Sequence, residues 1–271
     1  MSLNFDLKGK VAVITGATGI LCSVMARELA EKGAKVAILG RSGNQAQEMA
    51  QEFNNLGYQA IAYNADVLDK ASLVEARGYI LSQFKTIDIL INGAGGNKSQ
   101  ATTSETTSFF DLDPEAMKWV VDLNLMGTVL PTQVFGEVFA KEDKGCVVNI
   151  SSMAAYHPLT KTIAYSAAKA AVTNFTEWMA VHFNQNFSKN IRVNAVAPGF
   201  LLTKQNKFLL VDEKGEPTER GEKVLSKTPM GRYGEPSEIA GAVLWLCTDA
   251  ASFVNGATIP IDGGFSAYWG V

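Results

Sequence analysis

The sequence is poor in the residues that build disulfide frameworks and metal centres. It has three widely separated cysteines, Cys22, Cys146 and Cys247, and two histidines, His157 and His182. These positions match neither a disulfide framework nor the ligand spacing of a zinc site. We therefore expect a metal-free protein with no disulfide framework.

Long apolar runs and a strong charge of one sign are also lacking. No stretch reaches the ~20 apolar residues of a membrane span, and residues 1–6 show neither the basic nor the apolar region of a secretion signal. Lys and Arg number 24 and Asp and Glu 27, which gives a net charge of -3. This balance argues against binding to nucleic acid phosphates. We expect a cytoplasmic protein without a membrane or nucleic-acid partner.

What the chain does contain is enough apolar sequence for a large core. Of its 271 residues, 47% are hydrophobic and 19% are charged, as is usual for globular proteins. The length fits one large α/β domain or two small ones. Because no repeat, low-complexity tract or flexible linker divides the sequence, we expect a single domain over residues 1–271.

Seven short runs rich in β-branched residues alternate with segments of helical period. The runs cover residues 11–15, 36–39, 60–63, 87–91, 146–150, 191–196 and 258–261. Most are almost continuously apolar, which is typical of parallel strands covered on both faces. Between the first two runs, Leu21, Met25 and Leu29 recur at helical spacing, and Gly33 follows as a C-cap. The pattern predicts an α/β fold, a Rossmann-type doubly wound parallel sheet with helices on both faces.

Two polar segments interrupt this alternation. They cover residues 96–113 and residues 200–227. Long irregular segments in a compact domain are lids and binding loops, or they are tolerated surface insertions. The sequence leaves both readings open, and it makes the segment at about 200–227 the candidate substrate lid.

A turn with two glycines follows the first strand directly. Residues 15–22 read Thr-Gly-Ala-Thr-Gly-Ile-Leu-Cys and lead into a helix. Gly16 permits the tight turn, and Gly19 lets the main chain approach a diphosphate at the positive end of the helix. Cys22 stands where a full dinucleotide fingerprint has its third glycine, so we expect a packed thiol and slight widening. The turn predicts a nicotinamide cofactor, NAD(P)(H), held by Gly16, Thr18, Gly19 and Ile20.

The end of the second strand bears on which nicotinamide cofactor is used. NAD enzymes usually place an acidic residue there for the ribose hydroxyls, but this chain has Gly-Arg-Ser at 40–42. Arg41 either pairs with a 2′-phosphate or is a solvated loop residue, and we favour NADP(H). Further cofactor candidates follow the third and fourth strands, namely Asp66, Val67, Asn92, Gly93 and Ala94.

Four polar residues form the candidate catalytic set. Tyr165 and Lys169 are four positions apart and therefore share one helical face. Ser152 lies upstream, just past the strand at 146–150, and Asn124 lies on an expected helix. Any one of these residues could have a purely structural role, but the four together at these spacings indicate a catalytic site.

At this point the chain resembles the short-chain dehydrogenase/reductase family, essentially from end to end. The motifs that carry the resemblance are the turn at 15–22, Asp66, Asn-Gly-Ala-Gly at 92–95, Asn124, Ser152, Tyr165 with Lys169, Pro198-Gly199 with Thr203, and Asp-Gly-Gly at 262–264. The resemblance also implies a homotetramer with interfaces at 154–189 and 263–271.

The resemblance implies a role for each candidate. Tyr165 would be the general acid in carbonyl reduction and the base in the reverse direction. Lys169 would lower the tyrosine pKa from its ordinary value near 10 and hold the nicotinamide ribose. Ser152 would hydrogen-bond the substrate oxygen, and Asn124 would position a water of the proton relay. The nicotinamide would be anchored by Pro198, Gly199 and Thr203.

Within the family, the chain looks most like the branch of D-mannonate oxidoreductases, also called fructuronate reductases, close to the gluconate 5-dehydrogenases. The stretches that carry this likeness are 91–96, 122–128, 130–133, 149–153, 158–161, 180–183, 198–200, 228–232 and 263–268. It implies a keto sugar acid substrate, with D-fructuronate and D-mannonate as first choice. Such a substrate requires a cation and polar donors. The candidates are Asn97, Ser152, His157, Lys161, Tyr165 and Gln205.

Two alternatives remain at this point. One is a reductase of another carbonyl, such as a gluconate 5-dehydrogenase or an enzyme acting on acyl-thioesters or steroids. The other is a non-catalytic protein that senses the nicotinamide cofactor. The intact set of four polar residues argues against the second alternative, because a sensor has no need of a proton relay.

Overall fold

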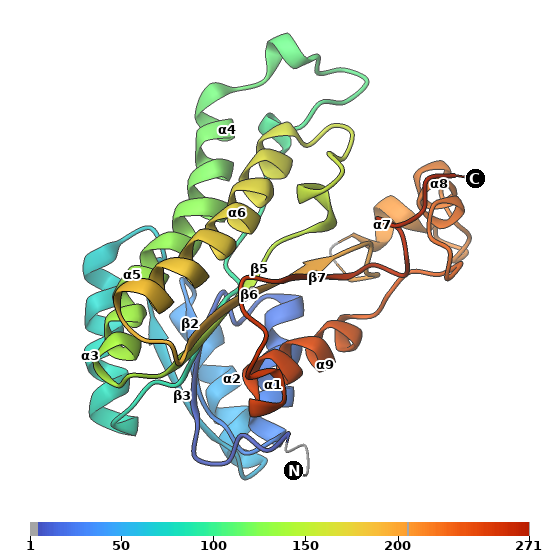
Figure 1. Ribbon diagram of the computed structural model, residues 1–271. Helices are drawn as coiled ribbons and strands as arrows, with labels where there is room; N and C mark the ends of the chain where they lie inside the picture. Colours follow the sequence, from blue (N-terminus) through green and yellow to red (C-terminus); the bar gives the residue numbers. More distant parts are fainter. Residues whose placement is uncertain (1–4, 205, 271) are drawn as a thin grey trace.

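The fold is built on a seven-stranded, fully parallel sheet flanked by helices (Figure 1). The computed structural model describes residues 5–204 and 206–270. The strands are β1 (Val11–Thr15), β2 (Lys35–Gly40), β3 (Gln59–Asn64), β4 (Ile89–Asn92), β5 (Gly145–Ile150), β6 (Ile191–Pro198) and β7 (Thr258–Ile261), in the order β3-β2-β1-β4-β5-β6-β7. All seven expected strands are present, to within two residues at each end, which confirms the predicted fold class.

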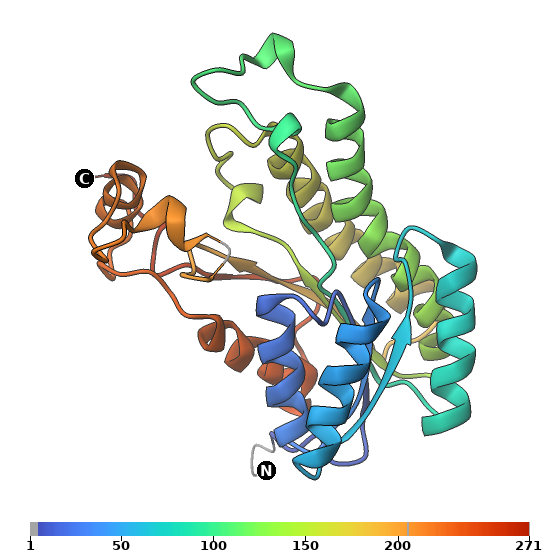
Figure 2. The same ribbon diagram turned by 180° about the vertical axis from the view of Figure 1, so that it is seen from behind.

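Helices cover both faces of the sheet (Figures 1 and 2). One layer contains α1 (Ile20–Glu31), α2 (Gly43–Asn55) and α9 (Pro236–Cys247), and the other contains α3 (Lys70–Phe84), α5 (Gly127–Lys141) and α6 (Ile163–Asn186). In β1, Ala12 and Ile14 pack into the first layer, whereas Val11 and Val13 pack into the second. Because successive side chains of a strand alternate between faces, a strand covered on both sides is apolar throughout, as the sequence indicated.

A row of buried side-chain hydrogen bonds crosses the second layer. We call Asn92, Thr132, Asn149 and Thr176 the polar ladder. The Asn92 amide donates to Thr132 Oγ1 at 2.9 Å and to Asn149 Oδ1 at 2.8 Å, and the Asn149 amide donates to Thr176 Oγ1 at 2.9 Å. All four side chains are at most 1% exposed. The ladder ties β4 and β5 to α5 and α6, and buried polar groups require such partners.

A π-helical turn interrupts the helix that leads into α5. Helix α4 (Pro114–Val121) runs through this turn, η3 (Asp122–Met126), directly into α5. Asn124 lies at its centre, and its amide nitrogen donates to Val120 O at 2.8 Å and to Gly96 O at 2.7 Å. Single π-turns inside helices are frequent at functional sites. This one joins the helix to the loop that follows β4.

The two irregular segments lie beyond the sheet, the first near α4 at the top of Figure 1 and the second around α7 and α8 at the right. The segment 96–113 contains the short turns η1 (Ser99–Ala101) and η2 (Phe109–Asp111). The segment 200–227 contains α7 (Lys207–Leu210) and α8 (Glu219–Ser226), and it is therefore less irregular than its composition suggests. Two further turns are η4 (Met153–Ala155), after β5, and η5 (Asp249–Ala251), after α9.

No helix in the described part of the chain is both long and apolar enough to cross a membrane.

Candidate active site

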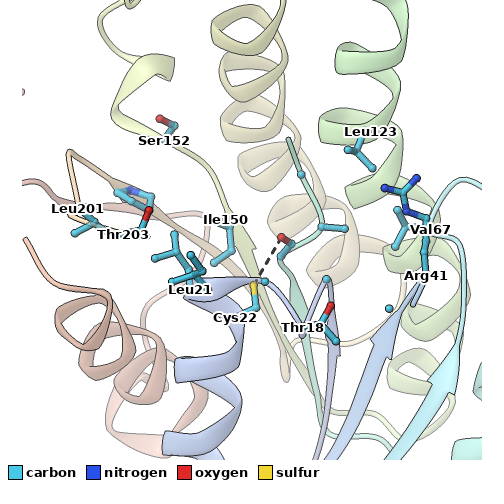
Figure 3. A pocket seen from close by; sticks show the side chains of 18 of the residues that line it. Thr18, Leu21, Cys22, Arg41, Val67, Leu123, Ile150, Ser152, Leu201 and Thr203 are labelled. Atoms are coloured by element: carbon cyan, nitrogen blue, oxygen red, sulfur yellow. Dashed lines mark hydrogen bonds between the residues drawn. The ribbon is translucent and has the colours of Figure 1, made fainter. Parts of the chain in front are cut away.

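A cavity of about 620 Å³ lies at the carboxyl edge of the sheet. It opens where the strand order switches between β1 and β4, the place where doubly wound sheets bind ligands. Arg41 and Val67 lie at one end and Ser152 at the other (Figure 3). The predicted residues that line it are Gly16, Thr18, Gly19, Ile20, Arg41, Val67, Gly93, Ala94, Ser152, Tyr165, Pro198, Gly199 and Thr203.

The N-terminus of α1 faces this cavity with free main-chain donors. Its N-cap, Gly19, supplies no side-chain cap, and no acidic residue lies in the first turn. Gly16 has a φ of +62°, and a Cβ atom there would lie 2.8 Å from Ala94 Cα. Free amide hydrogens and the positive end of a helix attract an anion. The turn therefore fits a diphosphate, as the sequence predicts.

Cys22 and Gly93 fit each other across the floor of the cavity. The Cys22 thiol lies 3.7 Å from Gly93 O, and a Cβ atom on Gly93 would collide with the Cys22 sulfur. A third fingerprint glycine would leave free space on α1, but Cys22 occupies that position. Gly93, the glycine after β4, leaves the space for the thiol instead. Burial raises the pKa of the Cys22 thiol to about 12, so the group is a packed, inert thiol.

Besides Lys169, which is described below, two predicted cofactor residues do not line the cavity. Asn92 is directed into the polar ladder, where its amide has two partners. Asp66 Oδ1 accepts from the Leu68 main-chain N–H at 2.9 Å, and this bond shapes the turn after β3. Both residues lie beside residues that do line the cavity, Gly93 and Val67. Because each is bound by its own neighbours, its contribution to the cavity is to shape the main chain.

The end of the cavity near β2 is open and polar. Arg41 is exposed, and its guanidinium has no hydrogen-bond or ion-pair partner among the described residues. Ser42 and Gln45 line the same end. An unpaired arginine beside two neutral polar side chains suits an anionic or hydroxyl-bearing group. Together, the free main-chain amides of α1, the floor at Gly93 and this polar end fit a nicotinamide dinucleotide.

The Ser152 and Tyr165 side chains meet at the other end. Ser152 is 7% exposed and follows β5, and its hydroxyl accepts from Ala154 N at 3.1 Å. Tyr165 comes from the first turn of α6. Burial raises the pKa of Tyr165, and a hydrogen bond with Ser152 lowers it. The net direction is upward, whereas the sequence analysis expected Lys169 to lower this pKa.

Lys169 is buried one turn further along α6. Its Nζ donates to Ile150 O at 2.7 Å and lies 5.6 Å from the centre of the Tyr165 ring. Burial lowers the pKa of Lys169 from 10.5 to about 8. The ammonium lies over the Tyr165 ring and near the end of β5.

The Asn124 side chain lies within this site, and both its nitrogen and its oxygen are hydrogen-bonded to main-chain groups. Besides its two donated hydrogen bonds, its Oδ1 accepts from Gly96 N at 3.4 Å. Its main-chain carbonyl accepts from Thr128 Oγ1 at 3.0 Å. A Cβ atom on Gly95 would lie 2.8 Å from Asn124 Oδ1 and 3.5 Å from Lys169 Nζ. Gly95 belongs to the motif at 92–95 but was not among the predicted cofactor residues.

The opposite wall comes from the residues that follow β6. Pro198, Gly199 and Thr203 line the cavity as predicted. Asn206 also lines it, and its side chain accepts from Thr203 N at 2.8 Å and donates to Leu201 O at 2.7 Å. An asparagine that bonds nearby main-chain groups stabilises a local turn, and Asn206 holds the turn that carries Thr203.

The predicted substrate residues do not all lie together. Ser152 and Tyr165 line the first cavity. His157 and Lys161 line a second cavity of about 510 Å³, with Phe200, Arg220 and Lys223. Asn97 is exposed, its amide donates to Thr102 Oγ1 at 3.0 Å, and it lines neither cavity. Gln205 lies outside the described residues. In the described ranges, no cluster of three or more His, Cys, Asp or Glu could hold a metal ion.

Known proteins resemble this chain over nearly its whole length. A family model described as "Enoyl-(Acyl carrier protein) reductase" matches residues 16–266. The uncharacterized oxidoreductase UxuB of Bacillus subtilis (strain 168) is 50% identical over 278 residues, which cover 99% of each chain. The structure of a candidate D-mannonate oxidoreductase from Haemophilus influenza, with bound NAD, is 48% identical and has a TM-score of 0.92 over 98% of both chains.

A more distant solved structure is also similar. It is a gluconate 5-dehydrogenase from Burkholderia cenocepacia J2315 in complex with NADP and tartrate. It is 28% identical, with a TM-score of 0.88 over 97% of this chain and 98% of that chain.

The fold, the cavity and these likenesses together define a nicotinamide-dependent oxidoreductase that acts on CH–OH groups. The chain belongs to the short-chain dehydrogenase/reductase family. This confirms the resemblance and the nicotinamide cofactor, and it sets aside the non-catalytic alternative.

Proposed function

We propose that the protein interconverts a keto sugar acid and its alcohol, with D-fructuronate and D-mannonate as the pair. The observation that carries this proposal is the second cavity, which is lined by the cations Lys161, Arg220 and Lys223, with Lys161 four residues before Tyr165 in the chain. A carboxylate-bearing substrate requires such a wall. The likeness to a candidate D-mannonate oxidoreductase supports the same substrate class.

The residues at the end of the first cavity would carry the proton. The cofactor, when bound, supplies the hydride for the carbonyl carbon. Ser152 donates a hydrogen bond to the carbonyl oxygen as negative charge develops there. Tyr165 then transfers its hydroxyl proton to that oxygen, and the product is the alcohol. Lys169 stabilises the resulting phenolate, and a water on the Asn124 carbonyl would resupply the proton.

For the cofactor, we propose a preference for NADP(H) over NAD(H). Arg41 supports it, since this exposed guanidinium is unpaired among the described residues and no acidic residue ends β2. The similar structures hold NAD in one case and NADP in the other. Arg41 is therefore the feature of this chain on which the preference depends.

The test is a coenzyme-depletion assay with NADH and NADPH in parallel, against D-fructuronate and 5-ketogluconate. We expect turnover of D-fructuronate with a higher kcat/KM for NADPH. Faster reduction of 5-ketogluconate would favour the alternative, a gluconate 5-dehydrogenase. If neither acid is reduced while both cofactors still bind, the proposed substrate class is wrong.

We further propose a cytoplasmic homotetramer. Large apolar side chains are exposed on α6, including Trp178 and Val181, and near the C-terminus, where Trp269 is 81% exposed. Such aromatic patches are typical of interfaces. The three cysteines are buried and unpaired, which suits a reducing compartment. Light scattering after size exclusion that gives the mass of one chain would contradict the tetramer, and recovery of the native protein outside the cytoplasmic fraction would contradict the location.

A further inference from the structure

The second cavity lies between a loop and the helical part of the 200–227 segment. Residues 157–161 form one wall and α8 the other, with Phe200 and Phe265 between them. The hydrogen bond from Lys223 lowers the pKa of Glu219 on α8, and the positive charge of Lys161 on the opposite wall adds to this effect. Phe200 of this cavity stands in the chain between Gly199 and Leu201, which line the first cavity, so the two cavities are neighbours along this segment.

The cationic side chains of this cavity differ in how much of their hydrogen-bonding capacity is already used. Lys223 Nζ lies 2.5 Å from Glu219 Oε1 in an ion pair on one face of α8. His157 contacts Ser266 O at 3.1 Å and packs edge-on against Trp269. Lys161 is exposed and has a left-handed backbone, with a φ of +81°. These residues are either paired or held at the rim.

Arg220 is the exception in the described part of the cavity. It is half-buried on α8, and its guanidinium has no hydrogen bond, ion pair or ring contact there. Two carboxylates line the same cavity, but Glu219 is paired with Lys223 and Glu105 is exposed at the rim. A guanidinium without a partner in the described part of the chain has five N–H donors available to a ligand that enters this cavity.

The position of Arg220 is fixed by its neighbours. Thr218 caps α8 by accepting from Gly221 N at 3.0 Å, and its hydroxyl donates to Leu209 O at 2.8 Å. Gly221 packs against the Leu210 carbonyl so closely that a Cβ atom would collide with it, and Tyr233 donates to the same oxygen at 3.1 Å. The helix is thus held against α7 at the residue next to Arg220.

We propose that Arg220 anchors the substrate carboxylate, so that a helix of the 200–227 segment selects acids over neutral ketoses. This assignment rests on the proposed function, because it requires a keto sugar acid as substrate. The planar guanidinium can hold both carboxylate oxygens with two parallel N–H donors, which a lysine cannot do. The keto group, at the other end of the substrate, would then lie toward Ser152 and Tyr165.

The test compares Arg220→Gln with Lys214→Gln, a control that removes a positive charge from an exposed site of the same segment outside both cavities. We expect R220Q to raise the KM for D-fructuronate about 30-fold or more, with kcat within about threefold of wild type and unchanged coenzyme binding by fluorescence. Arg220→Lys should recover part of the loss. D-Fructose, which lacks the carboxylate, should be reduced equally by R220Q and wild type.

The outcomes separate the two proposals. An unchanged KM in R220Q, or the same loss in K214Q, overturns the role of Arg220 and leaves the proposed function intact. An equal loss of activity on D-fructose also overturns it, since the arginine would then support the fold rather than bind the substrate carboxylate. A wild-type protein that reduces no keto sugar acid overturns both the proposed function and this assignment.

Discussion

The two walls of the active site are built in different ways. The wall from β1, β2 and β4 presents glycines, main-chain amides and small side chains, and its strands are buried in the core. The wall at the second cavity presents long charged side chains from a loop and a short helix. The first suits a ligand that is constant across a family, because main-chain groups change little with sequence. The second can change its ligand by single substitutions.

Where the walls meet, replacing Tyr165 should have the largest effect. Tyr165→Phe keeps the ring but removes the proton that the carbonyl oxygen needs. We expect a loss of about 10³-fold in kcat, within the range for general acid catalysis, and unchanged coenzyme affinity. Steady-state kinetics with fluorescence titration of the coenzyme checks both. A variant with wild-type kcat would show that another group supplies the proton.

Lys169→Met tests a residue that serves chemistry at the expense of stability. The folded pKa of about 8 lies below the unfolded value of 10.5, so below pH 8 the folded state carries a buried, protonated ammonium. We expect the variant to be inactive, yet about 2 kcal/mol more stable to urea at pH 7.

This difference has a defined pH dependence. Between pH 8 and 10.5 the unfolded wild type binds more protons than the folded form, so wild-type stability rises relative to the variant. The gain in the variant should therefore shrink across this window. Urea titrations at pH 7, 9 and 10.5 measure it, and a gain that grows with pH would contradict the assigned pKa.

The close packing of Gly93 against Cys22 in the first wall can be disrupted by one substitution and restored by a second. Gly93→Ala should destabilise the protein by about 2 kcal/mol, since its methyl group would collide with the Cys22 sulfur. The double variant Cys22→Ala with Gly93→Ala should recover most of this loss. Thermal unfolding of the two single variants and the double variant checks the coupling. Simple additivity would mean that the two positions are independent.

The smallest effect is expected at the edge of the first wall. Arg41→Gln should lower kcat/KM for NADPH about tenfold, because one charge-assisted contact to the 2′-phosphate is lost, and should leave NADH almost unchanged. Parallel assays with both coenzymes measure the ratio. An equal change for the two would show that Arg41 does not read the phosphate.

The sequence predicted most of the first wall because its signals are local. A strand, a glycine turn and a helix start lie within residues 11–31, and each has its own residue preferences. The same holds for Tyr165 and Lys169, which share a helix. The π-turn around Asn124 was not predicted, since nothing in Asp-Leu-Asn-Leu-Met alone separates it from an ordinary helix.

Contacts across the sequence explain what was missed. Asn92 reads as a strand-end residue beside the cofactor, but it is drawn into the polar ladder by partners at positions 132 and 149. Arg220 lies in a segment of alternating charge, and the fold shows that Lys223 is paired with Glu219 while Arg220 has no partner among the described residues. Asn97 looked suitable by its place after β4, but its amide is used by Thr102.

The polar ladder has a consequence for how the catalytic helix can move. Advancing α6 by one residue would turn its faces by about 100° and strip Asn149 of its bond to Thr176 inside the core. Leaving such a group unpaired costs about 1–3 kcal/mol, and this cost opposes a shift of α6 along its axis. The rotation of α6 about its axis, and with it the direction of Tyr165 and Lys169, is therefore fixed by residues of the polar ladder, which lie outside the cavity. Substitutions on α8 that change the substrate can then arise without moving the proton donor.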